Sequence, residues 1–187
     1  MKRNNDNDYA KIKRLRDAYN MIPNLVWSAL SFFPLTIYCY RYFGLKQILL
    51  LSAVSIIPIF FSNSFLNKIQ LSDKAIIYRK LAVTAINTIV QNGTFINRFI
   101  RKKFPDYKQP PLNKTSAKRL WRQTYFYEKF HLMLFIFFML TTVYAFIQKQ
   151  FGWAFLFLVT NLLYNVYPNL LQQYIRVKLK NYNAGRN

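Results

Sequence analysis

The chain is 187 residues long, 53% hydrophobic and 19% aromatic, and its 27 Lys and Arg against 6 Asp and Glu give a formal net charge of +21. This apolar content excludes an intrinsically disordered protein, because disordered chains lack the apolar side chains that a core requires. The chain has a single cysteine, which excludes an intrachain disulfide. With only one histidine in addition, it has too few Cys and His ligands for a zinc site.

Four apolar stretches approach the length of about 20 helical residues that crosses a membrane. They predict transmembrane helices over residues 22–42, 47–66, 130–147 and 151–171. The third stretch has no polar face, which argues against the alternative of a soluble helical bundle. Pro58 interrupts the second stretch, where we expect a kinked or tilted helix. The predicted fold class is all-α, a polytopic membrane protein forming one domain over residues 1–187.

The third and fourth stretches are separated only by Gln148 to Gln150, so they are expected to form an antiparallel helical hairpin. Residues 72–129, between the second and third stretches, are expected to form a basic amphipathic loop. Its first helix would begin at Ser72 as N-cap and end at Asn92-Gly93. The apolar face of that helix would carry Ile77, Leu81, Ala85 and Ile89.

A second basic amphipathic helix, over residues 95–104, is expected to lie in the membrane interface. It mixes apolar and cationic side chains and is followed by three prolines that end it. The simplest interpretation is a helix lying on the membrane surface, and whether it also shapes the opening through which substrate arrives is a separate hypothesis.

The distribution of Lys and Arg predicts the orientation, because cytoplasmic loops are enriched in them. Nearly all of the 27 basic residues fall in the tail 1–21, the loop 72–129 or the tail 172–187. With four crossings these three segments share one side of the membrane, so both termini and the central loop are expected in the cytoplasm.

Nucleic-acid binding is the alternative explanation of so many basic residues, since cations also neutralise phosphates. The basic residues adjoin apolar stretches on one predicted side, however, so topology and attraction to anionic lipid already account for them. We therefore expect a membrane-lipid partner and no nucleic acid.

A row of polar residues follows one face of the fourth helix and its continuation, at spacings of three and four: Asn161, Asn165, Asn169, Gln172 and Arg176. An unpaired amide in hydrocarbon costs on the order of several kcal/mol, so this face should turn toward other helices or a wet cavity. Two roles fit the row: hydrogen bonds between helices, which we favour for Asn161 and Asn165, and substrate binding. Pro168 lies within it and predicts a kink.

A second polar cluster, Thr124, Glu128 and His131, lies where the third helix enters the membrane. If the hairpin turns near Lys149, His131 comes level with Pro168 and Asn169, and Glu128 with Gln172. The two polar sets would then meet at the cytoplasmic membrane surface, which both a soluble donor and a lipid-embedded acceptor can reach.

His131 and Glu128 are the candidate catalytic residues. A histidine can take a proton from a hydroxyl while a carboxylate fixes its tautomer, as acyl transfer to an alcohol requires. The alternative is a solvated helix end or a structural hydrogen bond. The sequence contains no GxSxG, P-loop, HExxH or dinucleotide motif. We therefore predict no metal site and no cofactor.

Residues from about Tyr78 to Lys180 resemble the glycosyl-4,4'-diaponeurosporenoate acyltransferase family of small bacterial membrane proteins. Four segments carry the resemblance: YRKLAV at 78–83, NGTFINRFIRKKFPDY at 92–107, EKFH at 128–131 and NVYPNLLQQYIRVKL at 165–179. The chain differs from the family pattern at Gln173, Ile175 and Lys178, and the family's acidic LPDGG-like stretch is replaced by VQNGT.

The resemblance implies transfer of a fatty acyl group, from a thioester donor such as acyl-CoA, to a sugar hydroxyl of a glycosylated carotenoid or glycolipid in the bacterial inner membrane. Glu128 and His131 would be the acidic and imidazole positions of its motif. Its second element would supply the substrate-binding residues Asn165, Gln172, Tyr174 and Arg176. We add Asn169 to this predicted set. The alternative is a non-enzymatic lipid-handling or scaffold subunit whose polar rows only join helices.

Overall fold

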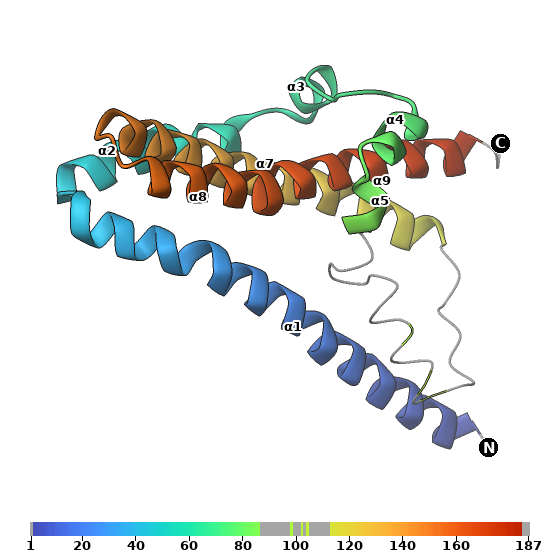
Figure 1. The fold of residues 1–187 in the computed structure, drawn as a ribbon. Coiled ribbons are helices and arrows are strands. Elements are labelled where there is room, and N and C mark those ends of the chain that lie inside the picture. Colours follow the sequence, from blue (N-terminus) through green and yellow to red (C-terminus); the bar gives the residue numbers. More distant parts are fainter. Residues whose placement is uncertain (1, 87–97, 99–101, 103, 105–112, 185–187) are drawn as a thin grey trace.

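The computed structural model describes residues 2–86, 98, 102, 104 and 113–184, and within these ranges every regular element is a helix (Figure 1). The all-α fold class is therefore confirmed. In chain order the helices are α1 (Lys2–Tyr42), α2 (Leu45–Ser55), η1 (Ile57–Phe60), α3 (Asn63–Lys68), α4 (Ala75–Lys80), α5 (Val83–Ile86), α7 (Lys114–Ile147), α8 (Phe151–Asn161), η2 (Leu162–Val166) and α9 (Tyr167–Ala184).

Three helical segments of the described chain are long and apolar enough to cross a membrane: residues 17–42 of α1, α7, and the continuous run Phe151–Lys180. They match the first, third and fourth predicted spans. In the second predicted span, α2 ends at Ser55 and Pro58 lies in the 3-10 turn η1. The interruption expected at Pro58 is therefore confirmed. The resulting apolar helix, Leu45–Phe60, is shorter than the other three.

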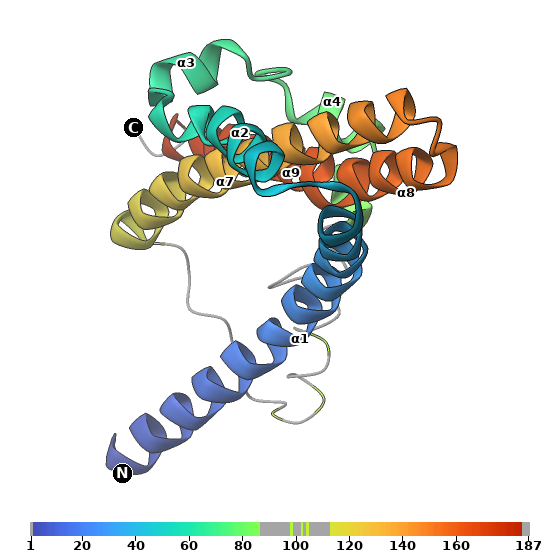
Figure 2. The same ribbon diagram turned by 90° about the vertical axis from the view of Figure 1, so that its left-hand side faces the viewer.

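The last two apolar segments form the expected antiparallel hairpin, with α7 beside α8 and α9 (Figure 2). Its turn is made by Lys149, whose φ of 60° lies in the left-handed region. The N–H of Gln150 bonds the carbonyl of Ala145 at 2.9 Å, which closes the end of α7. The turn position near Lys149 is thus confirmed.

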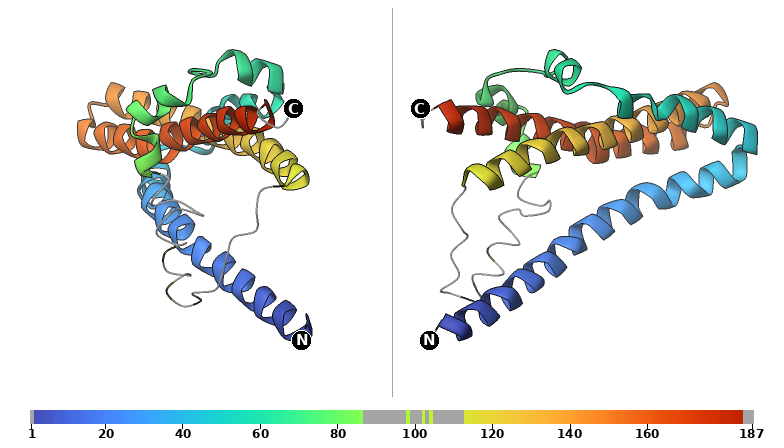
Figure 3. Two further views of the ribbon diagram at one scale, coloured as in Figure 1. Left: turned by 90° about the vertical axis from the view of Figure 1, so that its right-hand side faces the viewer. Right: turned by 180° about the vertical axis from the view of Figure 1, so that it is seen from behind.

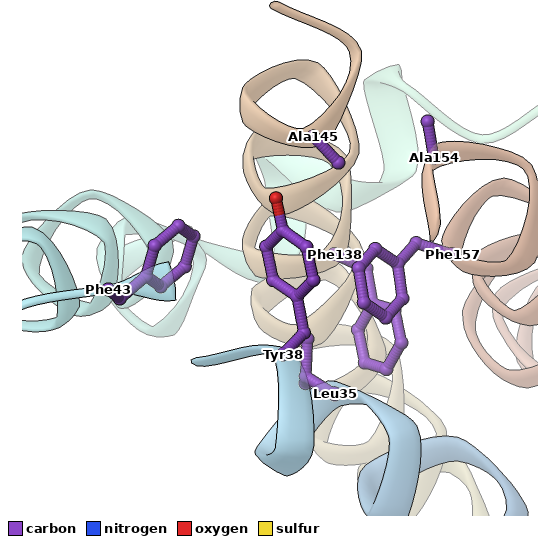
Figure 4. Close-up of a cluster of buried hydrophobic side chains, with 7 residues drawn as sticks. All are labelled: Leu35, Tyr38, Phe43, Phe138, Ala145, Ala154 and Phe157. Atoms are coloured by element: carbon purple, nitrogen blue, oxygen red, sulfur yellow. The ribbon is translucent and has the colours of Figure 1, made fainter. Parts of the chain in front are cut away.

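One hydrophobic core lies near this turn, where α1, α7 and α8 meet around Tyr38 (Figure 4). The Tyr38 ring is 5.1 Å from that of Phe157 and 5.5 Å from that of Trp153. The other buried members are Leu35, Phe43, Phe138, Ala145 and Ala154. Away from this core, α1 separates from the bundle toward its N-terminus (Figure 3), and it extends as one helix through most of the segment predicted as a basic tail.

A second core joins the central loop to α9 through Tyr78, Val83, Leu171, Tyr174 and Val177. The continuous helix predicted from Ser72 is wrong, since Ala82, with φ 57°, separates α4 from α5. Lys74 rather than Ser72 is the N-cap, and the Ser72 hydroxyl accepts from the Lys74 N–H at 3.0 Å.

The buried face of these two short helices also differs from the prediction. Tyr78 and Val83 are buried, whereas Leu81 and Ala85 are exposed. The break at Ala82 rotates α5 relative to α4, so residues spaced four apart no longer share a face. Ile89 and most of the predicted helix over 95–104 lie outside the described residues.

We predict that Lys149→Gly stabilises the hairpin by about 1 kcal/mol, because glycine adopts a positive φ without the steric cost that a side chain incurs there. Thermal unfolding in detergent micelles measures the change. Gln148→Gly is the matched control: its φ of −75° gives glycine no such advantage, so this variant should be destabilised. Equal shifts for both variants would contradict the explanation.

Candidate functional site

Both candidate catalytic residues, Glu128 and His131, lie on the continuous helix α7. Its N-cap is Asn113, whose side chain accepts from the Ser116 N–H at 2.7 Å, and the Ser116 hydroxyl accepts in return from the Asn113 N–H at 2.9 Å. This capping box satisfies two N–H groups that a helix start leaves open. With its start fixed, α7 continues to Ile147 and presents Glu128 and His131 toward η2 and α9.

Glu128 is bound by two side chains of α9. One carboxylate oxygen accepts from Gln173 Nε2 at 2.8 Å, and the other forms an ion pair with Arg176 Nη1. Both charged side chains are buried, with exposures of 2% or less. Because each neutralises the other, two charges can be accommodated where water is excluded.

Arg176 makes further contacts that hold its guanidinium in place. Its Nη2 donates to Gln70 Oε1 at 3.4 Å, and its guanidinium lies 4.5 Å from the centre of the Tyr125 ring. Tyr125 in turn bonds Asn67 at 2.9 Å. The ion pair therefore joins α7 and α9 to the segment that follows the second apolar helix.

Gln173 extends this network to Tyr78. Its Oε1 accepts from the Leu71 N–H at 3.1 Å and lies 3.3 Å from the Tyr78 hydroxyl. That hydroxyl donates to the Ser72 carbonyl at 2.8 Å and accepts from the Ser72 N–H at 3.1 Å. Burial raises the pKa of Tyr78, so the neutral hydroxyl that these bonds require is maintained.

His131 lies on the same side of α7 but has different neighbours. Its ring meets the Tyr164 ring edge-on, with centroids 5.9 Å apart. The imidazole interacts with the side chain of Asn165 and the backbone of Tyr164. Its Nδ1 atom is nevertheless buried without a hydrogen bond of normal geometry to any described residue.

The π-turn η2, which carries Tyr164 and Asn165, presents these groups to His131. Pro168 has no N–H, so it cannot bond the carbonyl of Tyr164 four residues before it. The chain widens into η2 instead, where the Tyr167 N–H bonds the Leu162 carbonyl. Such widened turns are frequent at functional sites, and this one gives the kink predicted at Pro168 a defined form.

The polar row of the fourth span is buried at Asn161, Asn165, Asn169 and Arg176. Asn161 donates to the Phe135 carbonyl at 3.1 Å and accepts from Asn165 at 2.8 Å, so these two amides contact α7 and each other. Three atoms of the row have no hydrogen-bond partner among the described residues: Asn165 Oδ1, Asn169 Oδ1 and Arg176 Nε. His131 Nδ1 is likewise buried without a hydrogen-bond partner among the described residues.

Several predicted site residues have a different place from the one expected. The network uses Gln173, and Gln172 is only half-buried. Tyr174 is buried in the second core, with its ring 6.2 Å from that of Tyr78. Glu128 bonds α9 through both oxygens, so its contacts are with Gln173 and Arg176 and not those of a residue orienting His131.

Sequence reasoning missed Gln173, Gln70, Tyr125 and Tyr164. Gln173 stands beside the predicted row, where one residue of helical register decides which glutamine turns inward. Gln70 and Tyr125 carry no pattern that separates them from other polar residues of the loop and of α7. Tyr164 directly precedes Asn165 in the row, and the Pro168 signal, which frees the Tyr164 carbonyl, was the available clue.

We predict that Glu128→Leu or Arg176→Met alone destabilises the protein by about 3–5 kcal/mol, because each leaves an unpaired buried charge. The double variant should recover most of that loss. Thermal unfolding in micelles gives the coupling between the two sites. The exposed pair Lys180–Asp73, at 3.7 Å, is the matched control, and its neutralisation should cost less than about 1 kcal/mol. Additive losses at Glu128 and Arg176 would contradict the coupling.

Comparison with known proteins identifies one family. The model of the family described as "glycosyl-4,4'-diaponeurosporenoate acyltransferase" matches residues 62–184. This range includes the whole network around Glu128, as well as His131, Tyr164 and Asn165. No curated protein and no solved structure gives a significant match. Because the match covers more than half of the 187 residues, the chain belongs to the glycosyl-4,4'-diaponeurosporenoate acyltransferase family, a group of acyltransferases of carotenoid biosynthesis.

Proposed function

We propose that the protein transfers a fatty acyl group from a soluble thioester donor, such as acyl-CoA, to a sugar hydroxyl of a glycosylated carotenoid or related glycolipid. The observation that carries the proposal is the burial of three polar atoms of α7, η2 and α9 without a hydrogen-bond partner among the described residues. Buried polar atoms are normally hydrogen-bonded, so His131 Nδ1, Asn165 Oδ1 and Asn169 Oδ1 are suited to bind groups that a substrate supplies. All three can accept hydrogen bonds, and hydroxyl groups donate them.

His131 is the general base in this proposal. Its nitrogen removes the proton from the acceptor hydroxyl as the oxygen attacks the thioester carbonyl. The new ester bond forms, the carbon–sulfur bond breaks, and the thiolate leaves with the proton that the imidazolium returns. The products are the acylated acceptor and a free thiol, so no further reactant is needed.

Glu128 and Arg176 have a positioning role in this proposal. Their charges neutralise each other, which leaves Arg176 unsuited to binding an anionic donor. They hold α7 against α9 and thereby place His131 beside Asn165 and Tyr164. Gln173 and Tyr78 extend this support to the central loop.

We further propose four membrane crossings, with both termini and the central loop on the cytoplasmic side of the inner membrane. The short apolar helix Leu45–Phe60 lies against α7, and Lys129 Nζ donates to the Ile59 carbonyl at 3.1 Å. Its end therefore comes level with the polar end of α7. The two ends of the described chain lie toward one end of the molecule, opposite the α7–α8 turn (Figure 1), and Lys and Arg collect in the segments assigned to the cytoplasm.

We predict that His131→Ala lowers the rate of acyl transfer by about 100-fold or more, the usual contribution of a general base. Purified protein in lipid nanodiscs, assayed with acyl-CoA and a long-chain alkyl glucoside, gives the rate by mass spectrometry of the ester. Gln148→Ala, in the exposed turn of the hairpin, is the matched control and should retain full activity. A normal rate in inserted His131→Ala protein would exclude His131 as the base.

A comparison of pigments and lipids with and without the gene separates the enzyme from a scaffold subunit. We expect one acylated, glycosylated species to disappear without the gene, and His131→Ala to reproduce that loss while the protein stays in the membrane. Under the scaffold alternative, which the bonds of Glu128 to Gln173 and Arg176 would suit, the profile would not change.

A further inference from the structure

The N-terminal helix α1 lies outside the family match, yet it touches the surroundings of His131. The Ser28 hydroxyl lies 3.0 Å from the Tyr164 hydroxyl, and the Phe32 ring lies 5.6 Å from the Tyr164 ring. Tyr164 is also the residue whose ring meets His131 edge-on. One side chain of η2 therefore connects α1 to the proposed base.

The face of α1 that carries Ser28 is polar along its cytoplasmic half. Asn24, Ser28 and Ser31, at spacings of four and three, fall within about 60° of one another around an α-helix. Ser31 is 2% exposed and Ser28 contacts Tyr164, so this face turns toward the bundle. Val26 and Leu30 lie on the opposite face and are 50% and 62% exposed, as side chains that meet lipid would be.

Asn24 lies one helical turn before Ser28 on α1 and is exposed. Toward its N-terminus α1 separates from the other described helices (Figures 1 and 2). Antiparallel packing places Tyr38 against Phe157 and Ser28 against Tyr164. When this register is extended by one helical turn toward the N-terminus of α1, Asn24 comes level with the part of α9 that carries Pro168 and Asn169. Asn169 Oδ1 is one of the unsatisfied buried atoms.

An amide directed at hydrocarbon costs on the order of several kcal/mol, whereas one directed at a ligand's hydroxyl groups is satisfied. We propose that α1 forms one wall of the acceptor site, with Asn24 and Ser28 binding hydroxyl groups of the sugar head between α1 and the α7–α9 pair. The acceptor then arrives sideways from the membrane, its apolar tail remaining in lipid beside the exposed side chains of α1. This inference rests on the proposed acyl transfer and assigns its acceptor site.

The first test measures kinetics in nanodiscs with acyl-CoA and octadecyl glucoside. Asn24→Leu and Ser28→Ala should each raise the KM for the glucoside about fivefold or more, the equivalent of one hydrogen bond of about 1 kcal/mol. The KM for acyl-CoA should stay unchanged. Thr36→Val, an exposed position farther along α1, is the matched control. Glucoside KM values within about twofold of wild type for both variants would overturn the assignment.

The second test needs no catalysis. In a Cys39→Ser background, which removes the sole native cysteine, Asn24→Cys and Val26→Cys are labelled with a maleimide in nanodiscs of phosphatidylglycerol and phosphatidylethanolamine. Octadecyl glucoside should slow labelling at position 24 and leave position 26 unchanged. Equal rates at position 24 with and without glucoside would overturn the site. Protection at position 24 in a protein that transfers no acyl group would preserve the site and refute the proposed activity.

Discussion

Glu128 and Arg176 come from the two arms of the α7–α9 hairpin and meet where neither side chain is more than 2% exposed. Removing two ions from water is costly, and their attraction offsets this cost when their geometry is good and further hydrogen bonds are made. Gln173 bonds the carboxylate, while Gln70 and the Tyr125 ring contact the guanidinium. The register of α7 against α9 is constrained by this pair, since a shift of one residue along either helix would separate the charges.

The central loop depends on the same interaction. Gln173 binds the Leu71 N–H and lies beside the Tyr78 hydroxyl, so the segment after the second apolar helix is attached to α9 by polar bonds as well as by the second hydrophobic core. Burial keeps that hydroxyl neutral by raising the pKa of Tyr78. The arrangement explains how the described part of the central loop, residues 67–86, is held beside α7 and α9. The two motif residues therefore have different contacts. Glu128 joins α7 to α9, whereas His131 retains a ring nitrogen without a hydrogen bond to any described residue.

The surroundings of His131 follow from Pro168. The missing N–H of Pro168 prevents a normal helical bond to Tyr164, and η2 forms in its place. The Tyr164 backbone then interacts with His131, its ring lies edge-on to the imidazole, and its hydroxyl reaches Ser28 of α1. Tyr164, in the turn that precedes Pro168, thus contacts both α1 and His131 of α7. From Tyr38 to Ser28, α1 contacts the bundle, and toward its N-terminus it separates from the other described helices (Figure 3).

Composition and periodicity alone predicted the helical class, the positions of the three long apolar segments, the turn near Lys149 and the interruption at Pro58. These features are local: they depend on the length of apolar runs, on proline chemistry and on the few residues left for a turn. The burial of Asn161, Asn165 and Asn169 was also predictable, since an amide avoids hydrocarbon. Tertiary structure decided which partners the polar residues take. Gln173 turns inward instead of Gln172, Glu128 binds α9, and Ala82 divides the expected helix, because these outcomes depend on helix register and on contacts between distant segments.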